Sequence, residues 1–240
     1  MPSINSPGRS PVQSHLIYLR IRALAKETGK TVYVFTEDVC ASGGYFLALA
    51  GDEIYADPSS IVGSIGVISA SFGFDRLIDK IGVERRVYTA GERKMALDPF
   101  APEKPDEVAR LRNLQQDVHQ AFIVIVKERR GAKLKAPDSE LFSGEFWSGP
   151  KALELGLVDG VGDVRTKMRE RFGDKVRLPV IQFSGGWWRR RLGQSLGGAA
   201  AGLARQPIDP AGLAGGLGAG LAADLVSALE ARALWARFGL

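Results

Sequence analysis

The 240-residue sequence has few of the features that mark several classes of protein. It contains one cysteine, Cys40, so no disulfide can form within the chain. Its longest stretch without Asp, Glu, Lys or Arg covers residues 58–74, and five serines interrupt that stretch. With four glycines or prolines as well, the segment is not a membrane-spanning helix. The first residues also lack the charged and apolar regions that are typical of a signal peptide.

The composition is that of a globular protein. Apolar residues make up 45% and charged residues 25%, which excludes a disordered chain, a collagen and a coiled coil. The net charge of +5 fits either simple solubility or attraction to an anionic surface. Residues 185–220 contain 11 of the 29 glycines. We therefore predict a packed domain over residues 1–177 and a Gly/Ala-rich basic extension over residues 178–240, ending in a short amphipathic helix.

Strand and helix patterns alternate within the predicted domain. The expected helices cover residues 13–26, 43–50, 103–130 and 150–155, and the expected strands cover residues 31–36, 53–55 and 85–89. This alternation predicts an α/β fold with parallel strands. Residues 4–8 resemble the end of a strand that enters a Ser-Pro-Gly turn. We therefore expect the domain to lack an upstream strand–helix unit.

Ser42 is the sharpest candidate for chemistry. It follows a β-rich segment and precedes Gly43 and Gly44, which would let a substrate approach the backbone closely. A helix that begins there directs free N–H groups toward an oxyanion formed at Ser42, which suits a nucleophile. Serine is also a preferred residue for capping the start of a helix, so the spacing taken alone favours this purely structural role.

The base that would activate Ser42 is predicted to be a lysine. The chain has two histidines. His15 falls in the first expected helix without an evident acidic partner, and His119 falls in the charged long helix, where a surface or half-buried position is expected. Lys94 follows a predicted strand and a glycine turn, and a neutral lysine can act as a general base. A solvated turn lysine is the structural alternative. The Ser-x-x-Lys pattern at Ser148 and Lys151 is assigned to helix capping, because Pro150 follows Ser148 at a helix start.

Other kinds of site find no support in the sequence. Residues 63–68 lack the lysine of a phosphate-binding loop, and no spacing of Cys, His or carboxylates is typical of a metal site. Two tryptophans followed by three arginines at residues 187–191 fit either a membrane-surface anchor or a solvated tail.

Taken together, the segments resemble the signal peptide peptidase A (SppA) family of serine–lysine peptidases in the ClpP/crotonase superfamily. The resemblance runs in unbroken order from about Ile4 to Val164. Its segments are residues 4–8, 41–45, 57–67, Gly91 with Lys94, Pro99 with Phe100, and residues 144–162.

The resemblance implies a ClpP/crotonase-like spiral of β-β-α units without its first N-terminal unit. It implies that Ser42 is the nucleophile, that Lys94 is its general base and that Ser64 orients the lysine. Backbone N–H groups at Gly8 and Gly43 would form the oxyanion hole. The implied activity is that of a serine endopeptidase that cleaves apolar peptides, such as residual signal peptides, without a metal or other cofactor. The implied assembly is a ring-like homo-oligomer, with no nucleic-acid partner.

One residue departs from this pattern. The family has a second glycine after Ser-Pro-Gly, whereas this chain has Arg9. If that position needs a conformation open only to glycine, Arg9 would misplace an oxyanion donor. The alternative function is therefore a catalytically impaired homologue that acts as a peptide-binding or assembly subunit. An acyl-CoA enzyme of the crotonase type is a weaker alternative, and the location stays open between the cytoplasm and peripheral membrane contact.

Overall fold

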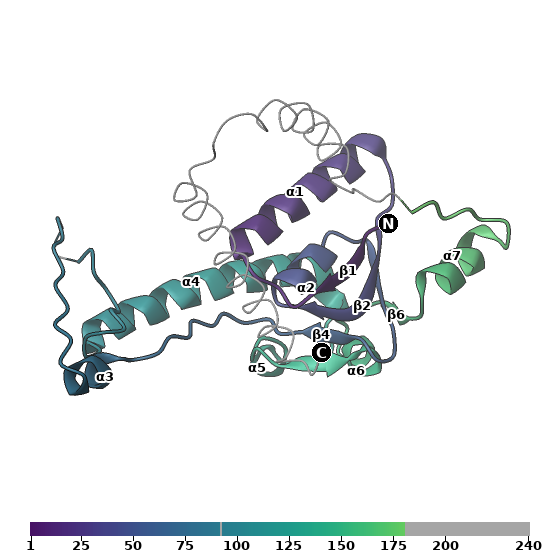
Figure 1. Cartoon of the computed structure of the whole chain (residues 1–240). Helices are drawn as coiled ribbons and strands as arrows, with labels where there is room; N and C mark the ends of the chain where they lie inside the picture. Colours follow the sequence, from purple (N-terminus) through teal and green to yellow (C-terminus); the bar gives the residue numbers. More distant parts are fainter. Residues whose placement is uncertain (92, 181–240) are drawn as a thin grey trace, which may run out of the picture. The chain divides into compact units, whose positions relative to one another are not determined.

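Strands and helices alternate in a mixed α/β fold (Figure 1). The computed structural model describes residues 1–91 and 93–180. The chain divides into two compact units, Met1–Thr166 and Lys167–Leu240, and the candidate site lies in the first. The elements are β1 (Ser3–Ser6), α1 (Pro11–Thr28), β2 (Tyr33–Ala41), α2 (Gly43–Ala48), β3 (Glu53–Ala56), β4 (Ile61–Gly63), α3 (Asp75–Lys80), α4 (Pro105–Arg130), a 3-10 turn (Gly131–Lys133), α5 (Asp138–Leu141), β5 (Phe146–Ser148), α6 (Gly149–Glu154), β6 (Gly160–Val161) and α7 (Val164–Phe172).

The sheet curls around β2. The order is β5-β4-β2-β3-β6, and β1 also pairs with β2. The first half of β2 pairs with β3, from Tyr33 to Thr36, and its last three residues pair with β4. Four of the five pairings among the described strands are parallel, and the pairing of β5 with β4 is antiparallel. This confirms the predicted α/β class and fits the spiral of the ClpP type.

The hydrophobic core covers β2 on both faces. Val34, Val39, Cys40 and Ala41 are fully buried, as the unbroken β-rich segment predicts. The strand continues five residues beyond the predicted end at Thr36, because β1 and β4 supply hydrogen-bonding partners for its second half. Because β2 ends at Ala41, Ser42 lies at the carboxyl edge of the sheet.

The two long helices match their predicted positions, and α1 leaves several apolar side chains exposed. Ser10 caps α1, and Gly29 ends it in the left-handed region. Leu16 and Leu19 are about half exposed, whereas Tyr18 is buried. The apolar periodicity of α1 therefore marks a helix correctly while leaving an apolar face in solvent.

The predicted strand at residues 85–89 is wrong. The structure has no regular element there, and Tyr88 is 90% exposed. Strand propensity needs a neighbouring strand to satisfy the backbone, and no strand among the described residues pairs with this segment.

Some predictions fall outside the described residues. These are the cationic aromatic segment at 187–191, the amphipathic C-terminal helix and most of the Gly/Ala-rich extension. The domain boundary after residue 177 stays a prediction. No helix among the described residues is long and apolar enough to cross a membrane.

Candidate functional site

Ser42 occupies a strained turn between β2 and α2. Its φ is 51° and its ψ is −119°, a conformation that residues with a side chain rarely adopt. The turn is held because the Ser42 N–H donates to Gly63 O at 2.8 Å, and Ser42 O accepts from Phe46 N at 2.9 Å. A sharp strand-to-helix turn of this kind exposes the hydroxyl of a nucleophilic serine.

The hydroxyl of Ser42 does not cap α2. The side chain makes no capping hydrogen bond although Ser42 precedes the first helical residue. The structural alternative of a simple helix cap is therefore wrong, and the strain at Ser42 is not repaid by a local hydrogen bond of its side chain. The same correction applies to Ser148, which precedes α6 without a side-chain capping bond, while Lys151 pairs with Glu154 at the surface.

Glycines let β1 and the following turn pack directly against this serine. A Cβ on Gly44 would fall within 3.0 Å of Ser6 O. A Cβ on Gly8, whose φ is +82°, would fall within 3.0 Å of Gly43 N and of the Ser42 Cβ. The structure thus brings Gly8, Ser42 and Gly43 together, as the family resemblance implies.

The backbone around Gly8 offers two N–H groups of different kinds. The Gly8 N–H donates to Ser6 Oγ at 3.2 Å. The Arg9 nitrogen lies 3.2 Å from the position that a Cβ on Gly43 would take, and its N–H has no partner among the described residues. Arg9 is absent from the residues with a side chain and positive φ, which are Ser42, Ser64 and Leu97 in the part of the chain described. Its backbone conformation therefore does not require glycine.

Ser64 lies next to Ser42 across two paired strands. Ala41 pairs with Gly63, so the residues that follow them are neighbours at the same edge of the sheet. Ser64 also has a positive φ, of 52°, and its N–H donates to Glu145 O at 2.6 Å. Two strained, half-buried serines thus stand side by side at the carboxyl ends of β2 and β4.

Lys94 lies apart from these serines in the single chain. It is exposed, and the segment around it is tied to the first turn of α4, where Leu97 N donates to Glu107 Oε2 at 2.8 Å. Figure 1 shows this segment beyond the N-terminal end of α4, away from α2.

The spacing along α4 shows how large this separation is. His119 Nε2 lies 3.0 Å from the carbonyl of Ile65, the residue after Ser64. His119 is 12 residues after Glu107, which corresponds to roughly 18 Å along a helix. The predicted nucleophile and base are therefore not brought together within the single chain.

Comparison with known proteins identifies the family. The model of Peptidase family S49 matches residues 24–174, a range that includes Ser42, Ser64 and Lys94. The chain belongs to peptidase family S49. The chloroplast serine protease SPPA of Arabidopsis thaliana is 33% identical over 66% of the S49 chain and 23% of its own length. Protease 4 of Haemophilus influenzae is 30% identical over 77% of the chain and 30% of its own length.

A longer match extends over nearly the whole S49 chain. A Brucella abortus protein named Na(+)/H(+) antiporter NhaA is 57% identical over 238 residues. This range is 99% of the chain and 31% of that protein. The chain therefore spans about a third of the Brucella relative, whose name describes the longer protein.

Two arginines of the S49 chain cap the far end of α2, which sequence reasoning missed. Arg129 Nε and Nη2 donate to Leu49 O and Gly51 O, both at 2.9 Å. Arg22 Nη1 donates to Ala50 O at 2.9 Å and contacts Asp52 at 2.8 Å. These residues come from α1 and α4, so no local spacing in the sequence could have shown that they meet.

Tyr45 anchors the middle of α2. It is fully buried, and its hydroxyl donates to Leu157 O at 2.7 Å. Burial raises the pKa of Tyr45 well above its usual value, so the hydroxyl stays protonated and remains a donor. Nearby, buried Arg130 contacts Asp159 at 2.7 Å and donates to Gly156 O at 2.9 Å. Short α2 is thus held by its own Tyr45, which bonds the Leu157 carbonyl, and by arginines from α1 and α4 that bond the turn after it.

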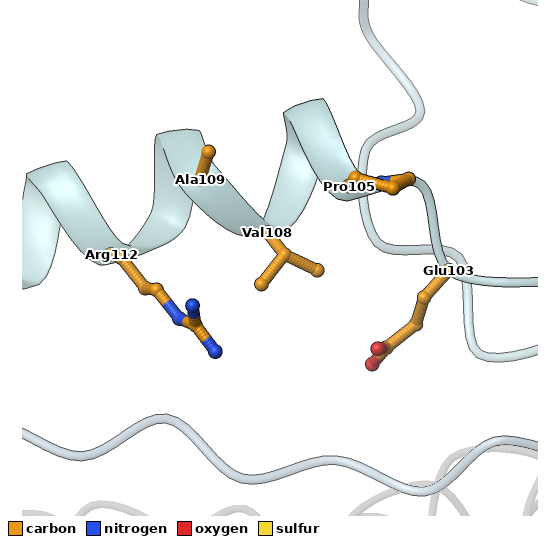
Figure 2. Close-up of a pocket in the computed structure, with 5 residues that line it drawn as sticks. All are labelled: Glu103, Pro105, Val108, Ala109 and Arg112. Atoms are coloured by element: carbon orange, nitrogen blue, oxygen red, sulfur yellow. The ribbon is translucent and has the colours of Figure 1, made fainter.

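A shallow cavity lies elsewhere, at the start of α4 (Figure 2). Its volume is about 310 Å³, and Val108 lies between the side chains of Glu103 and Arg112. None of the predicted site residues lines it. Among the described residues, no group of three or more His, Cys, Asp or Glu could hold a metal ion.

Proposed function

We propose that this chain is a serine endopeptidase whose nucleophile is Ser42 and whose general base is Lys94. The observation that supports it most is the strained turn at Ser42, whose hydroxyl caps nothing and which precedes a helix N-terminus. Membership of the S49 family and the protease names of its relatives support the same chemistry.

The proposed reaction begins at the Ser42 hydroxyl. Its oxygen attacks the peptide carbonyl while neutral Lys94 accepts the hydroxyl proton. The oxyanion binds the Gly43 N–H and a second N–H from the Gly8–Arg9 turn. Because the Gly8 N–H already donates to Ser6, the Arg9 N–H is the better placed of the two. Lys94 then protonates the leaving amine, and water, deprotonated by the same lysine, hydrolyses the acyl-enzyme.

The separation of Lys94 from Ser42 supports a homo-oligomer. The segment between β4 and α4 exposes large apolar side chains, including Ile68, Phe72, Leu77, Ile81 and Tyr88. Such a concentration of exposed apolar groups is typical of an interaction surface. We propose that this segment docks on a second copy and presents Lys94 to that copy's Ser42. The two contacting surfaces differ, so the contact is head-to-tail, and its repetition forms the proposed ring when the rotation between copies closes.

The proposed substrates are apolar peptides, such as residual signal peptides. The alternative is a catalytically impaired homologue that acts as a peptide-binding or assembly subunit, and the separation of Lys94 from Ser42 in the single chain is the observation that favours it. The presence of Arg9 does not favour this alternative, because the backbone conformation of Arg9 is one that any residue can adopt.

Turnover of a fluorogenic apolar peptide separates these possibilities. We expect Ser42→Ala and Lys94→Ala each to abolish turnover, and a mixture of the two to regain part of it, because mixed oligomers contain intact Ser42–Lys94 pairs across their contacts. Each variant is checked for folding by circular dichroism and for size by light scattering. Equal turnover by wild type and Ser42→Ala would contradict the peptidase proposal. Loss in both variants without recovery on mixing and subunit exchange would contradict the contact between copies.

A further inference from the structure

Arg9 places a cation beside the nucleophile turn. Its backbone nitrogen lies 3.2 Å from the Cβ position of Gly43, the residue that directly follows Ser42. The side chain is exposed, and its guanidinium has no ion-pair partner among the residues that the structure describes. The residue whose backbone N–H is a proposed oxyanion donor therefore also carries an unpaired guanidinium.

The surroundings of Arg9 add positive potential. The 18-residue helix α1 begins two residues later, at Pro11, and has no acidic residue in its first turn. Its N-terminus is the positive end of the helix dipole. Asp38, an exposed acidic residue on β2, accepts a hydrogen bond from Asn5 Nδ2 at 2.7 Å and does not pair with Arg9. The charge of Arg9 is therefore available to a ligand.

We propose that Arg9 makes this site select peptides with a carboxylate within two residues of the cleaved bond. The inference rests on the proposed function, because it assigns the substrate class of the Ser42 site. A guanidinium binds a carboxylate through two parallel N–H···O bonds. The Arg9 backbone lies beside Gly43, so its side chain starts close enough to the cleaved bond to contact a substrate residue just before or after it. Arg9 thus adds an acidic requirement to an otherwise apolar peptide.

Paired peptides test the inference in the full chain. Each apolar fluorescent peptide carries Glu or its neutral isostere Gln at one of four positions. Two of these positions precede the expected cleavage site and two follow it. Cleavage gives kcat/KM, and fluorescence anisotropy with the Ser42→Ala chain gives Kd without any need for turnover. We expect a preference for Glu of roughly fivefold at one of the four positions, the size of effect that a partly exposed ion pair gives.

Variants of Arg9 assign the preference to its charge. Arg9→Gln should bring the ratio of kcat/KM for the Glu peptide to that for the Gln peptide to about one. Arg9→Glu should reverse the charge preference, so that a peptide with Lys at the same position is preferred to the Glu peptide. Arg20→Gln is the matched control, since Arg20 is an exposed arginine farther along α1 and its loss changes the net charge equally. That control should keep the wild-type ratio.

The outcomes separate this inference from the proposed function. Equal binding of Glu and Gln peptides at all four positions, no peptide binding at all, or a preference that survives in Arg9→Gln would overturn the role of Arg9. A Glu preference in binding that depends on Arg9, without cleavage by the wild type, would support Arg9 and contradict the peptidase proposal.

Discussion

At the scale of single residues, the site is defined by where the backbone bears strain. Ser42 and Ser64 are neighbours, and both adopt a positive φ that side chains disfavour. Each such residue costs on the order of 1–3 kcal/mol, so the surrounding hydrogen bonds must hold it in place. The bonds from Ser42 N to Gly63 O and from Ser64 N to Glu145 O supply that constraint. Strain stored at adjacent serines is typical of a functional site.

Two glycines with positive φ allow the effect of backbone strain to be measured apart from the effect of steric crowding. Gly8 and Gly29 both have positive φ, but a Cβ on Gly29 meets nothing within 4 Å. Gly29→Ala should cost about 1–2 kcal/mol of stability through backbone strain alone and leave turnover intact. Gly8→Ala should also push the turn away from Gly43 N and lower turnover roughly 100-fold or more, as loss of an oxyanion donor does.

Urea unfolding and peptide turnover measure both effects. Comparable turnover in the two variants would show that the contact between Gly8 and Gly43 does not shape the oxyanion hole.

At the scale of elements, α2 is a short helix that depends on its neighbours. Six residues are too few for a stable isolated helix. The carbonyls of the turn directly after it accept guanidinium N–H groups from Arg22 and Arg129. Its core side chain Phe46 stacks on Phe122 of α4 with ring centroids 4.8 Å apart. Because Ser42 directly precedes α2, the orientation of this helix fixes the hydroxyl and the Gly43 N–H.

Arg129→Ala tests this dependence. The change leaves Leu49 O and Gly51 O without their donors, which should cost about 1–3 kcal/mol of stability. We also expect kcat to fall more than KM rises, because the nucleophile is misplaced while the substrate surface remains. Arg110→Ala on the same helix removes a surface pair with Asp106 and should change stability by less than about 1 kcal/mol. Identical kinetics in the two variants would contradict the positioning role of Arg129.

The helices and central strands could be predicted from the sequence because their signals are local. Apolar periodicity marks α1 and α4, and the β-rich run at Tyr33–Thr36 marks β2. The strand expected at residues 85–89 fails because pairing depends on a distant partner. The contacts of Arg22 and Arg129 could not be predicted for the same reason, because they join α1 and α4 to the turn after α2. Ser42, Gly8 and Ser64 could be grouped through the family resemblance, but their φ angles could not.

At the scale of the whole molecule, a buried ion pair ties α4 to the loop before β6. The Arg130 side chain is 2% exposed and contacts Asp159 at 2.7 Å. Asp159 also accepts from Ile54 N, which links the pair to β3. Burial alone would raise the pKa of Asp159, but hydrogen bonds from Arg130 and Lys133 outweigh it and lower the pKa below its usual value.

This lowered pKa predicts acid-sensitive stability. The folded-state pKa of Asp159 lies below the unfolded value of about 3.9, so its contribution is complete above that value and is lost as the pH falls through the folded pKa. Asp159→Asn should cost about 3 kcal/mol at pH 7, because Arg130 is left buried without its counter-ion. Urea unfolding at pH 7 and at about pH 3 should show a smaller difference between the two chains at the lower pH. A constant difference across this range would contradict the assignment.

The central claim is that Ser42 forms a covalent acyl-enzyme, and peptide mapping by mass spectrometry tests it most directly. The folded chain is incubated with an apolar peptide ester, quenched in acid and digested. We predict an acyl group on the peptide that contains Ser42, with no label there in Ser42→Ala and a much slower labelling rate in Lys94→Ala. A folded and assembled wild-type chain that carries no label at Ser42 would contradict the account. So would a Ser42→Ala chain that is labelled at another residue to the same extent as the wild type.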